Sequence, residues 1–335
     1  MNPPRVLLTN PIEPDERLRL AGHCEVTELA SQDAASVLAG AREAQVIIVR
    51  APLPDDIFER CPTVLAAVRH GAGTDMIPVE RATAAGVMVA NAPGANAVTV
   101  AEYALSQMLQ LSRRLSRIDR TLREQDWARA RLFADGGTDL AGRTLGVIGT
   151  GAIGTALGRM AGLGLSMTVL GHRRSPGALP EPMQRASLDE LLERSDYVAL
   201  ACPLTEQTRG LIGAKQLARM KQGARLINVS RGAVVDQTAL IEALRDGHLG
   251  GAALDVFETQ PLPADSPLWG FDQVLLSPHM AGITIDSMRR MSRMVVDQVL
   301  DMLAGQAPRH FVNPQVWPTR RPNPFAGPGP GPKAG

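Results

Sequence analysis

A glycine-rich turn between a strand and a helix constrains the fold of this chain more than any other segment. A strand-like run at 144–148 leads directly into Gly149-Thr150-Gly151-Ala152-Ile153-Gly154, and a helical pattern follows to residue 163. The first glycine permits a tight turn, the second lets backbone approach a pyrophosphate, and the third lets the helix pack on the strand. The helix amino terminus adds unpaired N–H groups. The motif predicts a dinucleotide-binding domain, with a glycine-rich turn that binds nothing as the alternative.

The end of the next strand indicates which dinucleotide is preferred. A site selective for NAD usually carries Asp or Glu there, because a carboxylate binds the ribose 2′-hydroxyl and repels a 2′-phosphate. Here the run at 167–171 continues with His172-Arg173-Arg174. Guanidinium groups pair with phosphate. We therefore expect His172, Arg173 and Arg174 to contact the cofactor and NADP(H) to be favoured over NAD(H), with solvated surface arginines as the alternative.

Strand-like runs alternate with helical segments along most of the chain. Such alternation is typical of parallel sheets covered by helices. The sequence therefore predicts an α/β protein with two doubly wound parallel sheets. The runs lie at 5–9, 45–49, 64–68 and 87–90, and then at 143–149, 167–171, 196–201, 224–229, 250–256 and 273–277.

The segments between these runs predict the domain boundaries. A stretch without Pro or Gly from Asn96 to about Leu122 predicts one long helix that leaves the first domain, and 284–304 is helical again. We expect residues 1–97 and 287–316 to form the first domain and residues 98–286 to form the dinucleotide-binding domain. The segment 317–335 is rich in Pro and Gly, which predicts a disordered tail.

Composition excludes several classes of protein. Lys and Arg number 35 against 34 Asp and Glu, so the chain lacks the basic field that nucleic acid or an anionic membrane needs. Cysteine occurs only at Cys24, Cys61 and Cys202, which argues against disulfides and zinc and favours a reducing, cytoplasmic setting. No apolar run reaches the roughly 18 residues of a membrane span. We therefore expect no metal, no nucleic-acid partner and no membrane partner.

Several segments in one order resemble the D-isomer-specific 2-hydroxyacid dehydrogenases, which include glyoxylate/hydroxypyruvate reductases and phosphoglycerate dehydrogenases. The resemblance extends from about residue 5 to residue 314. It implies an NAD(P)-dependent oxidoreductase that interconverts a small 2-oxo acid and its D-2-hydroxy acid, with a flavodoxin-like substrate domain and a Rossmann domain. The segments that carry it are HGAGTD (70–75), NAVTVAEYAL (96–105), the glycine motif (149–154), CPLTEQTRGLI (202–212), NVSRGAVVD (228–236), ALDVFE (253–258) and SPH (277–279).

The resemblance assigns catalysis to Arg231 and His279. Reduction of a 2-oxo acid needs a cation that holds the carboxylate and polarises the carbonyl, and a proton donor near the carbonyl oxygen. Arg231 follows a predicted strand, and α/β sheets bind ligands at the carboxyl ends of strands. His279 follows Pro278, which restricts the backbone that aims the imidazole. A surface arginine and a structural histidine are the alternatives.

The resemblance also assigns contacts with substrate and cofactor. Backbone N–H groups of His70-Gly71-Ala72-Gly73 would grip the substrate carboxylate, with a plain turn as the alternative. Asn96 would contact substrate, although an N-cap explains it equally well. Asp255 would bind the nicotinamide carboxamide. For Cys202, a buried apolar role and a cofactor contact are equally consistent with the sequence. The other cofactor contacts are Gly149, Gly151, Ala152, Ile153, Gly154, Pro203, Thr208, Val229, Ser230 and Gly282.

One position departs from the family's usual pattern. Members that reduce 2-oxo acids usually carry Glu before a proline in a segment like ALDVFETQP, and here that residue is Gln260. A carboxylate near an imidazole raises the imidazole pKa, whereas Gln accepts a hydrogen bond without supplying charge. Three outcomes follow. His279 acts with Gln260 and reduction falls off at a lower pH than with Glu, or Glu258 replaces the carboxylate, or the reaction changes to formate oxidation.

The leading hypothesis is reduction of a small 2-oxo acid such as glyoxylate or hydroxypyruvate. Formate dehydrogenases look similar around Gln260 and His279, but the chain is short for that group, so formate oxidation ranks lower. A nucleotide-sensing binding protein that resembles the C-terminal-binding corepressors is an alternative from another class. The long helix after Asn96 and the Arg-rich segment that follows it predict a homodimer.

Overall fold

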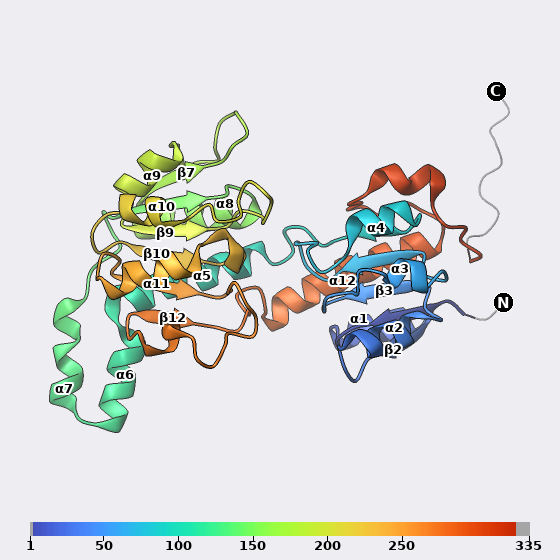
Figure 1. The fold of residues 1–335 in the computed structure, drawn as a ribbon, viewed down its shortest axis with the longest axis horizontal. Coiled ribbons are helices and arrows are strands. Elements are labelled where there is room, and N and C mark those ends of the chain that lie inside the picture. The colour runs from blue at the N-terminus through green and yellow to red at the C-terminus, as the bar shows by residue number, and fades with distance from the viewer. Residues whose placement is uncertain (1–2, 326–335) are drawn as a thin grey trace. The chain divides into compact units, whose positions relative to one another are not determined.

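The structure is a computed structural model that describes residues 3–325 and divides the chain into two units (Figure 1). The first unit contains the chain up to Asn96 and the chain from Ile283 onward, and the second unit contains Ala97–Gly282. Both units are parallel sheets covered by helices, so the predicted α/β class with two parallel sheets is confirmed. Within residues 3–325, no helix is long and apolar enough to cross a membrane.

The first unit is built on a parallel sheet whose two faces are both buried. Val6 and Leu8 belong to one core and Leu7 to the other, because successive residues of a strand point to opposite faces. The sheet has the order β2 (Glu25–Glu28), β1 (Arg5–Leu8), β3 (Val46–Val49), β4 (Ala66–Arg69) and β5 (Met88–Ala90). One core includes α1 (Pro14–Ala21) and α12 (Ile285–Leu303), and the other includes α2 (Ala34–Ala41), α3 (Ile57–Arg60) and α4 (Val79–Ala84).

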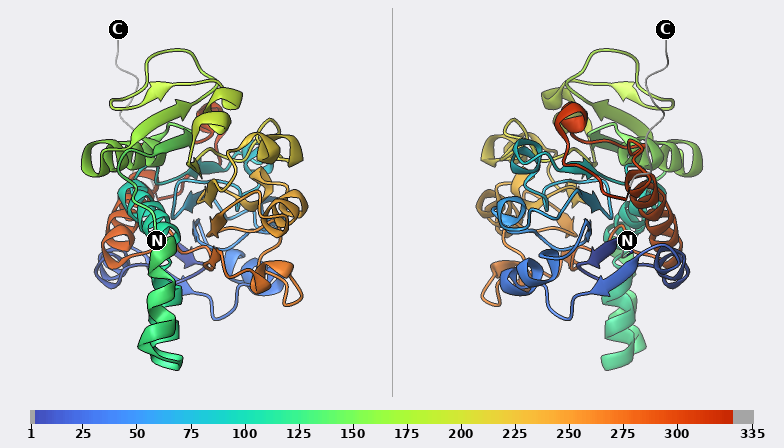
Figure 2. Two further views of the ribbon diagram at one scale, coloured as in Figure 1. Left: turned by 90° about the vertical axis from the view of Figure 1, so that its left-hand side faces the viewer. Right: turned by 90° about the vertical axis from the view of Figure 1, so that its right-hand side faces the viewer.

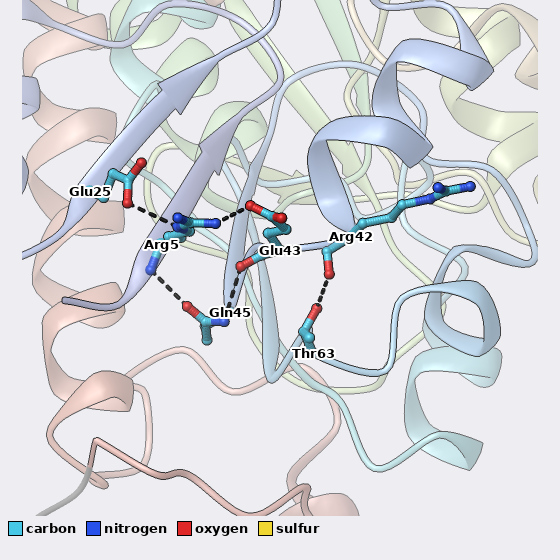
Figure 3. Close-up of polar contacts among 6 residues, drawn as sticks. All are labelled: Arg5, Glu25, Arg42, Glu43, Gln45 and Thr63. Atoms are coloured by element: carbon cyan, nitrogen blue, oxygen red, sulfur yellow. Dashed lines mark hydrogen bonds and ion pairs between the residues drawn. The ribbon is translucent and has the colours of Figure 1, made fainter. Parts of the chain in front are cut away.

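Polar side chains join the amino-terminal ends of three strands of this sheet (Figure 3). Arg5 donates its backbone N–H to Gln45 Oε1 at 2.7 Å and its Nε–H to Glu25 at 2.9 Å, and its guanidinium also pairs with Glu43. These side chains are largely exposed, so the ion pairs contribute little stability. The network lies at the amino-terminal edge of the sheet, whereas the candidate substrate loop follows the carboxyl end of β4.

The predicted disordered tail, 317–335, is ordered at its start. Trp317 packs edge-on against Phe311 with ring centroids 6.1 Å apart, and η5 (Pro314–Thr319) buries Val316. The Arg321 guanidinium donates to the carbonyl oxygens of Phe58, Cys61, Val64 and Ala85. The prediction was wrong for 317–325, because this arginine satisfies backbone carbonyls of the core and fixes the segment to the first unit. Residues 326–335 lie outside the described residues.

The second unit is built on a larger parallel sheet. From β6 the chain adds β7 and β8 on one side and then returns to add the remaining strands on the other. The order therefore reverses between β6 and β9, and open α/β sheets bind ligands at the carboxyl ends of strands at such a point. The strand order is β12 (Val274–Leu276), β11 (Gly251–Leu254), β10 (Arg225–Asn228), β9 (Tyr197–Leu200), β6 (Thr144–Ile148), β7 (Thr168–His172) and β8 (Gln184–Arg185).

Helices cover both faces of this second sheet. One core includes α5 (Ala97–Arg113) and α8 (Ala152–Arg159), and the other includes α9 (Leu188–Arg194), α10 (Ala214–Arg219) and α11 (Gln237–Arg245). The short helices of this unit are η1 (Ala134–Gly136), η2 (Met160–Gly164), η3 (Gly232–Val234) and η4 (Pro267–Gly270).

The single long helix predicted from Asn96 to Leu122 is broken at Arg114. This residue has a φ of 55°, between α5 and α6 (Leu115–Glu124). The Gln110 Oε1 accepts hydrogen bonds from the Ser116 N–H at 3.0 Å and the Ser116 hydroxyl at 2.9 Å, so a side chain caps the new helix. Helix α6 lies beside α7 (Trp127–Leu132), and the pair extends away from the rest of the second unit (Figures 1 and 2). We call α6 and α7 the arm.

Candidate active site

A cavity of about 640 Å³ lies in the second unit where the strand order reverses. Its volume is within the range of small-molecule sites, roughly 300–1,000 Å³. The predicted cofactor residues that line it are Gly149, Gly151, His172, Arg173, Arg174, Cys202, Pro203 and Thr208. The sequence did not predict the other lining residues, which are Ile148, Thr150, Ser175, Ala201, Gln207 and Leu211.

The three motif glycines have different environments in this cavity. A Cβ at Gly149, where φ is 97°, would lie 2.4 Å from the backbone nitrogen of Cys202, and one at Gly154 would lie 2.1 Å from the carbonyl oxygen of Gly149. A Cβ at Gly151 would meet nothing within 4 Å. Gly149 and Gly154 therefore allow close packing, whereas Gly151 faces open space at the start of α8. The first amides of that helix have no partner within it. These residues fit the pyrophosphate of a dinucleotide.

The two arginines after β7 have different partners. The Arg173 guanidinium donates to the carbonyl oxygens of Pro176 at 3.2 Å and Ala178 at 3.3 Å, so it folds into its own loop. Arg174 instead donates to Gln207 Oε1 at 2.8 Å, on the other wall of the cavity. Arg185, which the sequence did not single out, donates to three carbonyls of the same loop: those of Arg173, Ser175 and Gly177.

The loop after β9 forms one wall of the cavity, and hydrogen bonds within the loop stabilise it. The Thr208 hydroxyl donates to the carbonyl oxygen of Pro203 at 2.7 Å and accepts from the N–H of Thr205 at 2.7 Å. Cys202 is buried, and burial raises the pKa of its thiol, which keeps it neutral. Cys202 thus serves as an apolar surface of the cavity.

Arg231, Asp255 and His279 follow three neighbouring strands, β10, β11 and β12, at the carboxyl edge of the same sheet. Asn228 shapes the first turn, because its Oδ1 accepts from the Ser230 N–H and its Nδ2 donates to the Arg231 carbonyl. The Arg231 Nη1 donates to the Ser230 carbonyl at 2.7 Å. The next residue is Gly232, where a Cβ would lie 1.9 Å from the Phe257 carbonyl carbon, so only glycine lets the first two turns touch.

Asp255 is buried and anchors the turn that carries His279. Its Oδ1 accepts from the Ser277 hydroxyl at 2.6 Å and the Met280 N–H at 2.8 Å, and its Oδ2 accepts from the Ala281 N–H at 2.9 Å. The backbone N–H of His279 also donates to the Asp255 carbonyl at 2.9 Å. The contact of Asp255 with a nicotinamide carboxamide stays a prediction. The carboxylate contacts described above are all with the protein itself.

The His279 ring faces Gln260. The His279 Nδ1 lies 3.1 Å from Gln260 Oε1, and Gln260 Nε2 donates to the Phe257 carbonyl at 3.3 Å. Because the Phe257 carbonyl can only accept, the NH2 group of the Gln260 side chain faces Phe257 and the side-chain oxygen faces the imidazole. Nδ1 therefore carries a proton in this pair, and Nε2 is the nitrogen that can exchange a proton with a substrate. Glu258 is exposed, and Gln260 occupies the position beside Nδ1.

The predicted substrate loop lies in the first unit, after β4. His70 is buried, with Nε2 2.8 Å from the Ser292 hydroxyl, and burial, aided by the charges of Arg50 and Arg69, lowers the pKa of His70 to about 3. The N–H groups of His70 and Gly71 donate to the carbonyls of Val49 and Arg69. Neither amide can therefore grip a carboxylate in this conformation. For Ala72 and Gly73 that role stays a prediction.

The remaining predicted residues lie outside the cavity. Val229 and Ser230 follow β10, and Gly282 is the last residue of the second unit. Ala152 and Ile153 form the first turn of α8, and Asn96 is the last residue of the first unit before α5. Their contacts with cofactor or substrate stay predictions.

Comparison with known proteins places the chain in a family. Residues 105–281 match the family model described as D-isomer specific 2-hydroxyacid dehydrogenase, NAD binding domain. The chain is 39% identical over 284 residues to the glyoxylate reductase of Korarchaeum cryptofilum, which covers 84% of this chain and 85% of that protein. The chain belongs to the D-isomer specific 2-hydroxyacid dehydrogenase family. The resemblance stated from the sequence motifs is confirmed, and this 2-hydroxyacid dehydrogenase is an oxidoreductase.

Two further relatives share nearly the whole length of this dehydrogenase. Glyoxylate/hydroxypyruvate reductase B of Pectobacterium carotovorum is 37% identical over 317 residues, which cover 93% of this chain and 99% of that protein. A solved structure of the NADPH-dependent glyoxylate/hydroxypyruvate reductase of Sinorhizobium meliloti, in complex with NADP and malonate, superposes with a TM-score of 0.83. It is 30% identical and covers 96% of this chain and 99% of that chain.

Among the residues that the sequence did not predict, Gln207 and Arg185 hold the loop that bears the two arginines beside the cavity of this dehydrogenase. Gln207 lies inside the segment CPLTEQTRGLI, but its contact with Arg174 crosses 33 residues of sequence and has no local signal. Arg185 precedes α9 and gives no motif at all. Both are found only when the loops after β7 and β9 are placed.

Proposed function

We propose that this dehydrogenase uses NADPH to reduce a small 2-oxo acid of the glyoxylate or hydroxypyruvate type to its D-2-hydroxy acid. The observation that carries the proposal is the order of strand ends: β10, β11 and β12 end in turns that contain Arg231, Asp255 and His279, on the same sheet edge as the glycine-loop cavity. Carbonyl reduction needs a cation and a proton donor, and Asp255 anchors the turn that carries the imidazole.

Arg231, His279 and Gln260 have separate roles in the proposed reaction. When bound, the nicotinamide cofactor supplies the hydride. The Arg231 guanidinium would hold the substrate carboxylate with two parallel N–H donors and polarise the adjacent carbonyl. The His279 Nε2 would deliver the proton to the carbonyl oxygen, while Gln260 accepts from Nδ1–H and keeps the ring oriented. Because Gln260 carries no charge, it orients the imidazole without adding the electrostatic support that a carboxylate gives to the protonated ring.

Steady-state turnover with a panel of acids tests this proposal. We expect NADPH oxidation with glyoxylate and hydroxypyruvate, and a fall in kcat/KM of about 10²–10³-fold in Arg231→Ala. Arg245→Ala, an exposed arginine on α11, is the matched control and should retain activity. Reduction of NADP by formate without turnover of any 2-oxo acid would establish formate oxidation instead. Tight nucleotide binding without any turnover would support the binding-protein alternative.

The preference for NADPH rests on Arg174 rather than on both arginines equally. Arg173 is engaged with carbonyls of its own loop, whereas Arg174 reaches across the cavity to a neutral side chain that a 2′-phosphate can replace. We expect Arg174→Ala to raise the KM for NADPH about tenfold and leave the KM for NADH within about twofold. Arg173→Ala should weaken binding of both nucleotides, and Arg159→Ala, exposed on α8, should change neither. Equal effects of Arg174→Ala on both nucleotides would contradict this assignment.

The arm is the surface that supports a homodimer. Trp127 is 74% exposed and Leu132 is 70% exposed, and Leu115 and Leu122 of the same pair of helices are also exposed. Such a concentration of exposed apolar side chains marks an interaction site. We expect a dimer in sedimentation equilibrium and a monomer for the pair of changes Trp127→Glu and Leu132→Glu. Leu163→Glu, at a residue that is 68% exposed on η2, should stay dimeric. A monomeric wild type would refute this part.

The proposed setting is cytoplasmic. Cys24, Cys61 and Cys202 are all buried and carry free thiols in the part of the chain that the structure describes. Free thiols of this kind persist in a reducing compartment. Fractionation of cells that express the native chain would test the location.

A further inference from the structure

We infer that Tyr103 is a positioning residue for His279, and that it acts through Ser277 and Asp255. Tyr103 lies on α5, and its hydroxyl contacts the Ser277 hydroxyl across a sequence separation of 174 residues. Ser277 in turn contacts the Asp255 carboxylate at 2.6 Å. No sequence motif linked this tyrosine to the catalytic turn. The kinetic part of the inference rests on the proposed function, whereas its structural part does not.

The direction of each hydrogen bond follows from which groups carry a proton to donate. Both oxygens of the Asp255 carboxylate accept a backbone N–H, so the carboxylate is an acceptor toward Ser277 as well. The serine hydroxyl has one proton, which it donates to Asp255. Ser277 can therefore only accept from Tyr103, and the phenol is the donor. The result is a directed chain from Tyr103 to Ser277 to Asp255.

The phenol of Tyr103 is held in its protonated form. Burial raises the pKa of Tyr103, the hydrogen bond with Ser277 opposes this shift, and the charge of Asp255 adds to it. The ring also packs against the apolar core beneath α5, so it cannot swing away at low cost. Tyr103 therefore remains a donor throughout the neutral pH range.

This chain of hydrogen bonds supports a strained turn. His279 has a φ of 54°, a left-handed conformation that is unfavourable for residues other than glycine. Such a conformation persists only when surrounding contacts over-determine it. Asp255 makes these contacts, since it binds the residues before and after His279 through Ser277, Met280 and Ala281. Tyr103 fixes the one side-chain hydroxyl in that set, so its loss should let the turn and the imidazole drift.

The substitution Tyr103→Phe removes only the donor. The chain contains two tyrosines, and Tyr197→Phe is the matched control, because the Tyr197 hydroxyl contacts Arg225 at 3.0 Å and is not part of this network. We expect Tyr103→Phe to lower kcat for 2-oxo acid reduction about three- to tenfold, with the KM for NADPH within about twofold, as for one lost hydrogen bond. Tyr197→Phe should leave kcat unchanged.

A double-mutant cycle tests whether Tyr103 acts through Ser277. If it does, Tyr103→Phe should have little further effect in the Ser277→Ala background, and Ser277→Thr, which keeps the hydroxyl, should retain the wild-type response to Tyr103→Phe. Should Ser277→Ala fail to fold, Ser277→Cys replaces it, since a thiol is a weak acceptor and donor. Fully additive effects of the two changes on kcat would overturn the inference.

A second readout is independent of turnover. The protein has 6 histidines, and the imidazole NMR signals of His279 can be assigned by their loss in His279→Gln. We expect Tyr103→Phe to shift or broaden the His279 signals and Tyr197→Phe to leave them in place. An unchanged His279 spectrum in Tyr103→Phe would overturn the inference even if 2-oxo acid reduction is confirmed. A wild type without reductase activity but with the expected spectral change would refute the proposed function alone.

Discussion

The two units each place a histidine in the turn after a parallel strand, and the two residues have opposite environments. His70 follows β4, is 3% exposed and has Nε2 bound to Ser292. His279 follows β12 and has a left-handed backbone conformation, and its Nδ1 lies 3.1 Å from Gln260 Oε1. A position at the carboxyl edge of the sheet brings both near the region where α/β proteins bind ligands. The two imidazoles therefore differ in burial and in partner: the ring of His70 is enclosed beside a serine hydroxyl, whereas the ring of His279 is only partly buried and lies against an amide side chain.

Substitution of these two histidines should change kcat to very different extents. His279→Gln should lower kcat for reduction by about 10²–10⁴-fold, because it removes the proposed proton donor. His70→Gln should change kcat by less than about threefold, since the ring lies inside the first unit. Steady-state kinetics with hydroxypyruvate and NADPH measures both. Comparable losses of kcat in the two variants would contradict the proposed difference between His70 and His279.

The next effect concerns stability at His70. The Ser292 hydroxyl accepts from the Glu13 N–H at 3.0 Å and contacts His70 Nε2 at 2.8 Å. Ser292→Ala leaves the buried His70 ring and the half-buried Glu13 N–H without that partner, which should lower the free energy of unfolding by about 2–4 kcal/mol. Urea denaturation gives the value. Ser287→Ala, on the same helix, would be a poor control because it removes a capping box, so exposed Ser106→Ala on α5 serves instead.

A negative charge placed beside His279 should shift the pH dependence of the reduction reaction. Gln260→Glu supplies a carboxylate that favours the protonated ring, so reduction should persist to a pH about one unit higher. The same change sets a carboxylate oxygen against the Phe257 carbonyl in place of the present 3.3 Å hydrogen bond, which should reduce stability slightly. The pH dependence of kcat/KM measures the first effect. Glu258→Gln is the control, and an unchanged profile in Gln260→Glu would mean that residue 260 does not act on His279.

The last effect, which is absent at neutral pH, is the contribution of His70 to acid sensitivity. Its pKa is lowered from 6.5 to about 3 in the folded state, so the unfolded chain binds this proton more readily. Stability should therefore fall as pH drops below about 6.5, by up to about 1.4 kcal/mol per pH unit, and stay flat above it. His70→Gln should remove that part of the slope between pH 6 and pH 4, while exposed His23→Gln keeps it. Parallel slopes in all three proteins would contradict the burial of a neutral ring.

Local sequence patterns were enough for the sheet cores and the glycine loop. Strands such as β3 are buried on both faces, so they read as short apolar runs, and the Gly149–Gly154 turn has a fixed spacing set by backbone geometry. The strand β2 was missed because it is an exposed edge strand with polar residues. Both outcomes follow from burial, which is what hydrophobic patterns report.

Specific side-chain contacts could not be predicted in the same way. The break at Arg114 depends on how Gln110 turns toward Ser116, and the ordered tail depends on Arg321 reaching carbonyls more than 230 residues away. The link between Tyr103 and Ser277 likewise joins residues that carry no shared periodicity. Pairings of this kind leave no periodic pattern in the sequence.

The discontinuous first unit has a consequence for synthesis of the protein. Val6, Val46 and Val68 share a core with α12, which is made only after the whole second unit. At ribosomal speeds of about 5–20 residues per second, that face of the sheet stays exposed for on the order of 10–40 s before α12 has been synthesised. The second unit, being continuous, can reach its native state on the emerging chain. We therefore expect the amino-terminal third of the nascent polypeptide to be the part that needs chaperone protection.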